Sequence, residues 1–164
     1  MCSIIPNRHP ILLRNPDGAH AVTLLDIPYV PANGRLLSLD ALRPDRDSGI
    51  ALPVVLWLHR GGWYSGSKRN AIDTHMLDFL VRSGFVVASA EYRLSDEAPF
   101  PAQIHDVKAA IRWLRARPKV LGINPERVAL AGFSAGGHLA ALAATGVHHD
   151  RADLLLLCGF KGAL

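Results

Sequence analysis

The hydrophobic positions of the chain fall into short runs with two kinds of spacing. Several runs are dense in Val, Leu and Ala and too short for a helix, which is typical of strands buried on both faces. These runs are Pro53–Leu58, Phe85–Ala90, Arg127–Gly132 and Asp153–Cys158. Nearer the start, Val22–Ile27 and Arg35–Leu42 flank the turn signal Asn33-Gly34 and predict a hairpin-like pair of strands.

Between the buried runs, hydrophobic residues recur every three or four positions, as they do along one face of a helix. The segments with this spacing are Ser67–Ser83, a stretch that opens at Pro101 and ends before Pro118, and Ala135–Thr145. Strands that alternate with helices predict an α/β fold with a mostly parallel sheet and helices on both faces. We predict irregular structure for residues 1–20, which are rich in Pro, Asn and His.

Composition narrows the function classes. Of the 164 residues, 49% are hydrophobic and 20% charged, which is the balance of a soluble globular domain. The net charge of +4 is spread along the chain without a basic block, so we expect no nucleic-acid partner. No apolar stretch approaches the length of a membrane span or a signal-peptide core, so we expect no membrane association. Cys2 and Cys158 lack metal-ligand spacing and are expected to be free thiols, which favours the cytoplasm.

The strongest chemical signal is Gly132-Phe133-Ser134-Ala135-Gly136, which matches G-x-S-x-G between a strand and a helix. A serine in such a tight turn is presented at the edge of the sheet, and flanking glycines relieve the crowding. The helix that follows offers unpaired N–H groups to a developing oxyanion. The motif therefore predicts Ser134 as a catalytic nucleophile; a small-residue turn that merely packs a helix on a sheet is the alternative.

A second glycine-rich segment follows the Pro53–Leu58 strand. It reads His59-Arg60-Gly61-Gly62-Trp63, and its paired glycines let backbone N–H groups approach an anion. We predict an oxyanion hole formed by the N–H groups of Gly61, Gly62 and Ala135.

Together these motifs resemble the α/β-hydrolase esterases of the hormone-sensitive-lipase and feruloyl/acetyl-esterase-like type. The stretches that carry the resemblance are Val54–Trp63 with Gly66-Ser67-Lys68, Tyr92–Ser95 and Phe100-Pro101-Ala102 up to Asp106, and Gly122–Arg127 leading to Gly132–His138. The resemblance implies hydrolysis of small acyl esters through an acyl-enzyme, with no cofactor and no metal. It also implies that residues 21–164 are an incomplete α/β-hydrolase domain, whose C-terminal strands and helices are missing.

The chain departs from the family pattern at two points. Arg60 stands where the family usually has glycine, so we expect a strained loop if the position needs a positive φ, and otherwise a guanidinium that points to solvent. The family also places the triad Asp and His after the nucleophile, beyond Leu164. We therefore expect a truncated chain, weakly active or inactive. The unusual ending Cys158–Leu164 suggests a frameshift or altered splicing.

Residues inside the chain are poor substitutes for the missing pair. His148, His149, Asp150 and Asp153 follow the Ala135–Thr145 helix, which places them about 15 Å from Ser134. A general base must lie within about 3 Å or one water. The resemblance implies structural roles for His59, which braces its loop, and for Asp106. His138, one turn along the helix, is expected to pack or hydrogen-bond locally.

Two other functions stay open. The first is a non-catalytic interaction protein on a partial hydrolase fold. Its final strand would leave an exposed sheet edge that can pair with a second copy to form a homo-oligomer. The second is a peptidase of the same fold.

Overall fold

The computed structural model describes residues 11–14, 20–45, 49–70, 73–146 and 155–158. Its strands are β1 (Ile11–Arg14), β2 (His20–Ala32), β3 (Arg35–Pro44), β4 (Leu52–Leu58), β5 (Val86–Ala90), β6 (Ile123–Gly132) and β7 (Leu155–Cys158). Its helices are α1 (Thr74–Arg82), α2 (Ala102–Ala116), α3 (Pro118–Leu121) and α4 (Ala135–Thr145).

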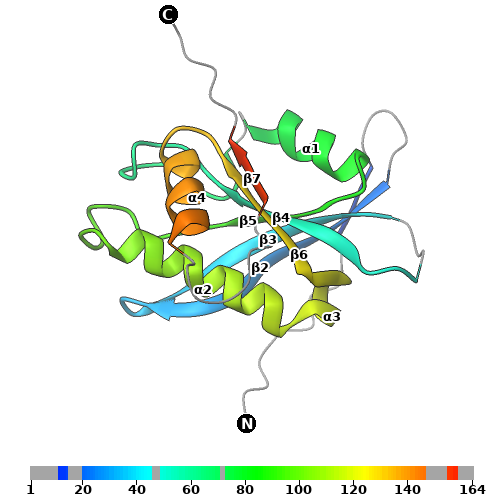
Figure 1. The fold of residues 1–164 in the computed structure, drawn as a ribbon, viewed down its shortest axis with the longest axis horizontal. Coiled ribbons are helices and arrows are strands. Elements are labelled where there is room, and N and C mark those ends of the chain that lie inside the picture. Colours follow the sequence, from blue (N-terminus) through cyan, green and yellow to red (C-terminus); the bar gives the residue numbers. More distant parts are fainter. Residues whose placement is uncertain (1–10, 15–19, 46–48, 71–72, 147–154, 159–164) are drawn as a thin grey trace, which may run out of the picture.

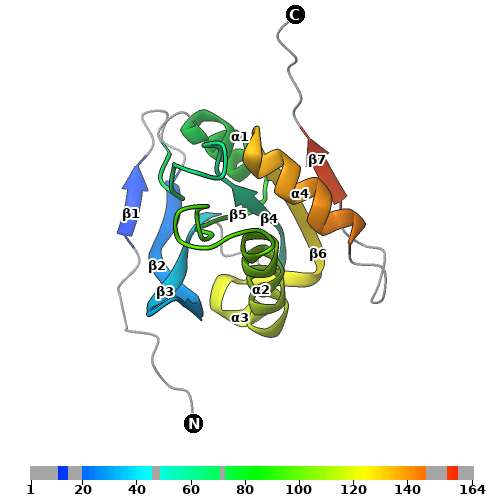
Figure 2. The ribbon, with the colours of Figure 1, turned by 90° about the vertical axis from the view of Figure 1, so that its left-hand side faces the viewer.

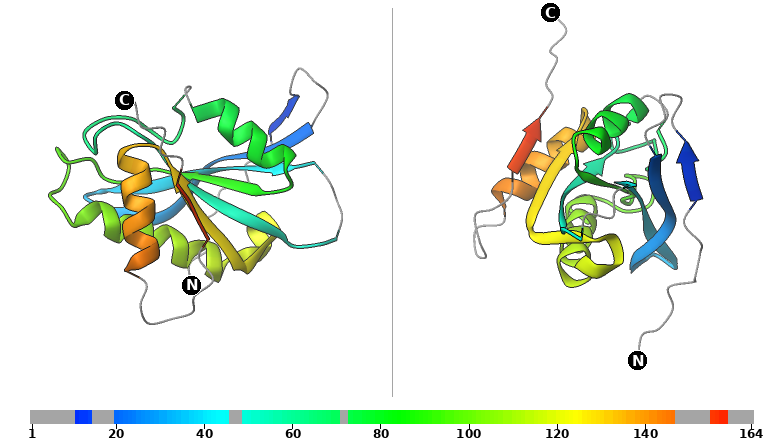
Figure 3. Two further views of the ribbon diagram at one scale, coloured as in Figure 1. Left: turned by 45° about the horizontal axis from the view of Figure 1, so that its top comes forward. Right: turned by 90° about the vertical axis from the view of Figure 1, so that its right-hand side faces the viewer.

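The strands form one sheet of seven in the order β1-β2-β3-β5-β4-β6-β7 (Figures 1 and 2). The first part of the sheet, from β1 to β5, is antiparallel, whereas β5, β4, β6 and β7 run parallel. The sheet is therefore mixed, with its parallel half built from the later strands. Within the described residues, β1 and β7 are the two edge strands, as the right-hand view of Figure 3 also shows.

The two faces of β4 pack against different helices, because successive side chains of a strand point to opposite faces. Val54, Leu56 and Leu58 are fully buried in a cluster with residues of α2 and α4. Val55 and Trp57 lie in a second cluster, with residues of α1. Helices therefore cover both faces of the sheet, as the strand–helix alternation predicts.

The structure differs from the sequence predictions in three places. Residues 11–14 form β1, paired antiparallel with β2, inside the segment for which we predicted irregular structure. The helix predicted from Ser67 begins at Thr74, because residues 59–70 form a loop held by polar contacts. The short helix α3 was not predicted; its four residues are too few to show a hydrophobic periodicity.

Candidate active site

Ser134 occupies a strained turn between β6 and α4. Its backbone has φ 52° and ψ −119°, a conformation that L residues rarely adopt and that costs on the order of 1–3 kcal/mol. The turn is closed by hydrogen bonds from the Gly136 N–H to the Phe133 carbonyl (3.0 Å) and from the His138 N–H to the Ser134 carbonyl (2.9 Å). Ser134 is exposed and has no hydrogen-bond partner for its hydroxyl within the described residues. The nucleophile predicted from the motif is thus presented to solvent.

The two motif glycines allow the turn to contact the end of β4. A Cβ at Gly136 would lie 2.0 Å from the Leu58 carbonyl oxygen and 2.7 Å from that of His59. A Cβ at Gly132 would lie 2.4 Å from the same Leu58 oxygen. Gly132 also pairs with Leu58 in the parallel β4–β6 ladder. Glycine is therefore required here for backbone-to-backbone packing, which brings the Ser134 turn next to the start of the His59–Gly66 loop.

The predicted oxyanion loop, His59–Gly66, folds back on itself through its first glycine. Gly61 has φ 131°, and its carbonyl accepts hydrogen bonds from the N–H groups of Tyr64 (3.0 Å) and Ser65 (2.9 Å). A Cβ at Gly61 would lie 1.9 Å from the Ser65 carbonyl oxygen. Gly62, at φ 62°, has open space around it. The tight turn thus depends on glycine at 61 for space and favours glycine at 62 for conformation.

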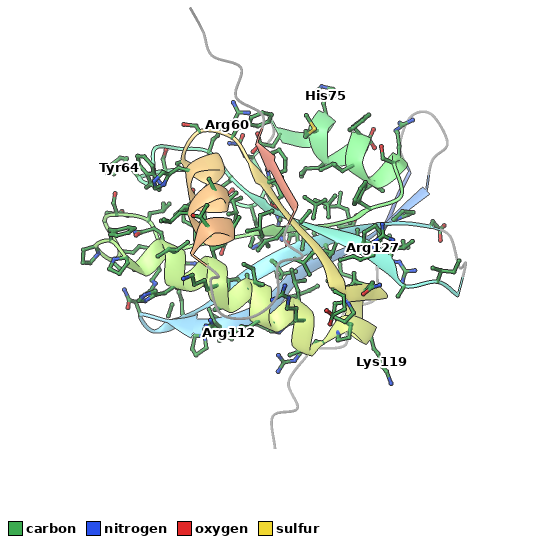
Figure 4. All side chains as sticks on the ribbon, viewed as in Figure 1. Arg60, Tyr64, His75, Arg112, Lys119 and Arg127 are labelled. Atoms are coloured by element: carbon green, nitrogen blue, oxygen red, sulfur yellow. The ribbon has the colours of Figure 1, made fainter. Side chains whose placement is uncertain are left out.

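A side-chain contact joins this loop to the helix after Ser134. The rings of Trp63 and His138 meet edge-to-face with centroids 5.3 Å apart. Ser134 and the N–H groups predicted to bind an oxyanion therefore lie on segments that are in contact. Among the described residues, no acceptor takes a hydrogen bond from the N–H of Gly61, Gly62 or Ala135. Figure 4 shows Tyr64 at the end of the molecule where α4 begins.

His59 braces the loop from beneath, which confirms the structural role predicted for it. Its buried ring stacks on Tyr92 with centroids 4.3 Å apart, and its Nδ1 lies 2.8 Å from the Arg60 carbonyl oxygen. The Tyr92 hydroxyl donates to the His59 carbonyl (2.8 Å). Burial lowers the pKa of His59 and outweighs the hydrogen bond with the Arg60 backbone and the attraction of the Glu91 and Asp73 carboxylates, all of which raise it. Burial likewise raises the pKa of Tyr92.

Two alternatives were expected for Arg60, a strained loop or a guanidinium that points to solvent, and the structure shows neither. It is not among the described residues with positive φ, so it does not strain the loop. Its guanidinium, instead of pointing to solvent, pairs with the buried carboxylate of Asp73 (Nη2 to Oδ1, 2.8 Å). It also lies over the Phe133 ring, 4.7 Å from the centroid. This pairing could not be predicted from the sequence, because Asp73 lies inside the segment predicted as helix.

A charged cluster holds the far end of the loop to the sheet. The buried Lys68 ammonium lies 3.0 Å from Asp26, 3.2 Å from Glu91 and 2.8 Å from the Ser38 hydroxyl. Arg69 adds contacts to Asp26 and Asp40, and hydrogen bonds from Arg69 and Lys68 are the main causes that lower the pKa of Asp26. The Ser89 hydroxyl donates to the Lys68 carbonyl (2.7 Å). Lys68, which the motif Gly66-Ser67-Lys68 marked without a role, therefore anchors the loop to β2, β3 and β5.

The remaining sequence candidates have structural contacts or fall outside the described residues. Asp106 accepts two hydrogen bonds from the Arg93 guanidinium (2.7 and 2.8 Å) and one from the Arg93 N–H, which confirms a structural role. His138 packs on Trp63, as described above. The candidates outside the described residues are His148, His149, Asp150 and Asp153.

Two further findings concern metal binding and membrane spans. In the part of the chain that the structure describes, no group of three or more His, Cys, Asp and Glu side chains is arranged to hold a metal ion. None of the described helices is long and apolar enough to cross a membrane.

Comparison with known proteins identifies the family of this chain. Residues 39–157 match the model of the BD-FAE family. The chain is 36% identical over 149 residues to esterase LipQ of Mycobacterium tuberculosis, a match that covers 90% of the chain and 34% of LipQ. It is 43% identical over 96 residues to carboxylesterase NlhH of the same species, covering 57% of the chain and 29% of NlhH.

Solved structures give the same result. A bacterial heroin esterase matches with a TM-score of 0.70 and 31% identity, over 87% of this chain and 44% of that one. A hyperthermophilic esterase from the archaeon Pyrobaculum calidifontis matches with a TM-score of 0.67 and 35% identity, over 77% and 40%. The chain thus spans less than half the length of these relatives. It belongs to the BD-FAE family and has the α/β-hydrolase fold of the esterases that it resembles.

Proposed function

We propose that this chain carries the nucleophile and the oxyanion-binding groups of a serine carboxylic ester hydrolase that acts on small acyl esters. One observation carries the proposal. An exposed Ser134, in a strained turn, contacts through its flanking residues a loop whose Gly61 and Gly62 N–H groups have no acceptor among the described residues. The named esterase relatives support the same reaction class.

In the proposed reaction, the Ser134 Oγ attacks the acyl carbon and forms a C–O bond as the carbonyl electrons move to oxygen. The N–H groups of Gly61, Gly62 and Ala135 donate to this oxyanion, and the N-terminal dipole of α4 stabilises its negative charge. Collapse of the intermediate breaks the bond between the acyl carbon and the alcohol oxygen, which leaves as the alcohol with the proton taken from Ser134. Water then hydrolyses the acyl-enzyme to the free acid and restores the Ser134 hydroxyl. Each oxyanion donor of this kind is worth about 10²–10³ in kcat.

The proton of Ser134 needs a base, and the two described histidines on the segments of the site, His59 and His138, are engaged elsewhere. His59 is buried under the loop with its ring stacked on Tyr92, and the His138 ring packs on Trp63. We therefore propose that the Asp–His pair comes from sequence outside the described residues. Without such a pair, a serine hydrolase loses on the order of 10⁶ in kcat. Donors and binding alone retain about 10³–10⁴ over water. The described part of the chain by itself is expected to be a weak esterase.

Two measurements test this function. Both use a form of the protein that includes the proposed Asp–His pair, because Ser134 without a base would react too slowly to test. The first is covalent labelling by a fluorophosphonate, located by peptide mass spectrometry, in the wild type, Ser134→Ala and Ser95→Ala. Ser95 is an exposed serine whose side chain makes no hydrogen bond within the described residues, so it controls for non-specific reaction. We expect the adduct on Ser134 in the wild type and in Ser95→Ala, and none in Ser134→Ala.

The second measurement is hydrolysis of p-nitrophenyl acetate and butyrate, with a peptide p-nitroanilide as the peptidase arm. We expect turnover of the esters that Ser134→Ala abolishes, and no turnover of the anilide. Equal labelling or equal hydrolysis in the wild type and Ser134→Ala would refute the proposal. Faster anilide cleavage would point to a peptidase.

A further inference from the structure

Arg60 is the residue at which this chain departs from the glycine usual in the esterases it resembles. The position tolerates a side chain, because Arg60 is not among the described residues with positive φ. The side chain lies between two elements of the proposed site: it directly precedes Gly61 in the oxyanion loop, and its guanidinium contacts Phe133, which directly precedes Ser134.

On one side, the guanidinium is held by a buried carboxylate. Arg60 donates to Asp73 Oδ1 from Nε (3.1 Å) and from Nη2 (2.8 Å). The other carboxylate oxygen, Oδ2, accepts from the Trp57 indole N–H (3.2 Å). The Asp73 side chain is 2% exposed and that of Arg60 32% exposed, so the carboxylate depends on these donors for compensation. Charge-assisted bonds of this kind fix the planar guanidinium in orientation.

On its other side, the same guanidinium contacts the Ser134 turn. Its Cζ lies 4.7 Å from the centroid of the Phe133 ring, within the range of a cation–π contact. The Phe133 ring in turn meets Trp57 edge-to-face at 5.4 Å. These contacts form a closed ring that links β4 to the residue before the nucleophile. Its members are Trp57, Asp73, Arg60 and Phe133.

We propose that Arg60 is a positioning residue, which fixes the Gly61 and Gly62 N–H donors relative to Ser134 by tying both segments to Asp73. The inference rests on the proposed function, since it assigns Arg60 a part in that same reaction. Catalysis is sensitive to such placement, because a displacement of about 1 Å can cost about 10²-fold in rate. Glycine at this position would leave the loop and the turn joined through the Trp63–His138 contact and the backbone packing at Gly136.

The test compares Arg60→Gly with the double variant Arg60→Gly/Asp73→Asn and with Arg127→Gln. The double variant removes the buried carboxylate charge that Arg60→Gly leaves uncompensated, so it separates stability from positioning. Arg127 is exposed in the middle of β6 and has no ion pair within the described residues (Figure 4). Its variant controls for the loss of one positive charge.

The first readout is fluorophosphonate inactivation, resolved into the maximal rate kinact and the binding constant KI, together with the melting temperature. We expect Arg60→Gly to lower kinact about tenfold at unchanged KI. The double variant should recover most of the lost melting temperature yet stay slow. The inference is overturned if the double variant recovers the rate along with the stability, or if Arg60→Gly reacts as fast as the wild type.

The second readout needs no activity. Amide hydrogen exchange is measured on peptides covering residues 59–66 and 132–138 in the same variants. We expect faster exchange in both segments for Arg60→Gly and for the double variant, and wild-type exchange in Arg127→Gln. If the wild-type protein fails to react with the probe, the proposed function fails, and the exchange result alone decides whether Arg60 ties the segments. Unchanged exchange in Arg60→Gly then overturns the inference.

Discussion

The Ser134 turn and the His59–Gly66 loop lie against each other but are stabilised in different ways. The turn is shaped by backbone contacts: Gly132 and Gly136 approach the Leu58 carbonyl closer than any Cβ could. The loop is shaped in large part by side chains from distant segments, since Tyr92, Asp73 and the residues around Lys68 each hold part of it. The loop shares this backbone crowding at Gly61, where a Cβ would lie 1.9 Å from the Ser65 carbonyl oxygen, but its polar side-chain contacts can be lost one at a time while the others remain.

This comparison predicts that the largest effect comes from crowding the turn. In Gly136→Ala the new Cβ would overlap the Leu58 carbonyl, which is backbone and cannot move without distorting β4. We expect a loss of about 3 kcal/mol or more in the free energy of unfolding, measured by urea denaturation. Gly84→Ala is the matched control, because the φ of 91° at Gly84 disfavours a side chain while the space around it is open. That variant should lose about 1–2 kcal/mol, and an equal loss in both would contradict the steric explanation.

Removing Lys68, the central cation of the charged cluster that holds the loop to the sheet, should have the next largest effect. In Lys68→Met the carboxylates of Asp26, Asp40 and Glu91 lose a buried partner, although Arg69 still pairs with two of them. We expect a loss of about 2–3 kcal/mol on urea denaturation, below the value for a fully isolated buried pair. Lys119→Met, at an exposed lysine without an ion pair in the described part of the chain, should change stability by less than about 0.5 kcal/mol. Indistinguishable variants would mean that Lys68 carries no structural role.

The strain at the nucleophile predicts a smaller effect of opposite sign. Because Ser134 has φ 52° and ψ −119°, Ser134→Gly should relieve strain that Ser134→Ala retains. We expect the glycine variant to unfold about 3 °C higher than the alanine variant in calorimetry, which corresponds to about 1 kcal/mol. Neither variant should react with a fluorophosphonate. A glycine variant less stable than the alanine variant would show that the turn is unstrained.

The smallest effect concerns pH. Burial lowers the pKa of His59 in the folded state below its ordinary value of 6.5, so the unfolded chain takes up a proton there first. The contribution of His59 to stability is therefore complete above about pH 6.5 and declines as pH falls below it. In His59→Phe, which preserves an aromatic ring against Tyr92, the urea midpoint should vary less between pH 7.5 and 5. A steeper dependence in the variant would reverse the sign assigned to His59.

The sequence predicted the half of this site that is determined sterically. A glycine on each side of Ser134 is a local signal, and the buried strands around it follow from hydrophobic spacing alone. The structural roles of His59 and Asp106 also followed from the family resemblance, and their contacts bear them out. The predicted donors Gly61, Gly62 and Ala135 lie on the two segments in contact, and their role stays a prediction.

The long-range pairs could not be predicted, because they join residues whose separation carries no periodic signal. Asp73 shows this most clearly. The helix predicted from Ser67 would have placed it mid-helix, whereas it precedes α1. Its carboxylate does not cap that helix, since Arg60 and Trp57 occupy both of its oxygens. The β1 strand was missed for a related reason: a short edge strand has too few residues to show alternation.

The parallel pairing of β4 with β6 bears on how the protein acquires its site during synthesis. The β2–β3 hairpin can form as soon as it leaves the ribosome, because its partners are neighbours along the chain. The ladder between Leu58 and Gly132, by contrast, can close only after β6 has emerged far downstream. The loop finds its polar partners in earlier segments, but the Ser134 turn follows β6, so a nascent chain cannot have the complete site in place until β6 docks.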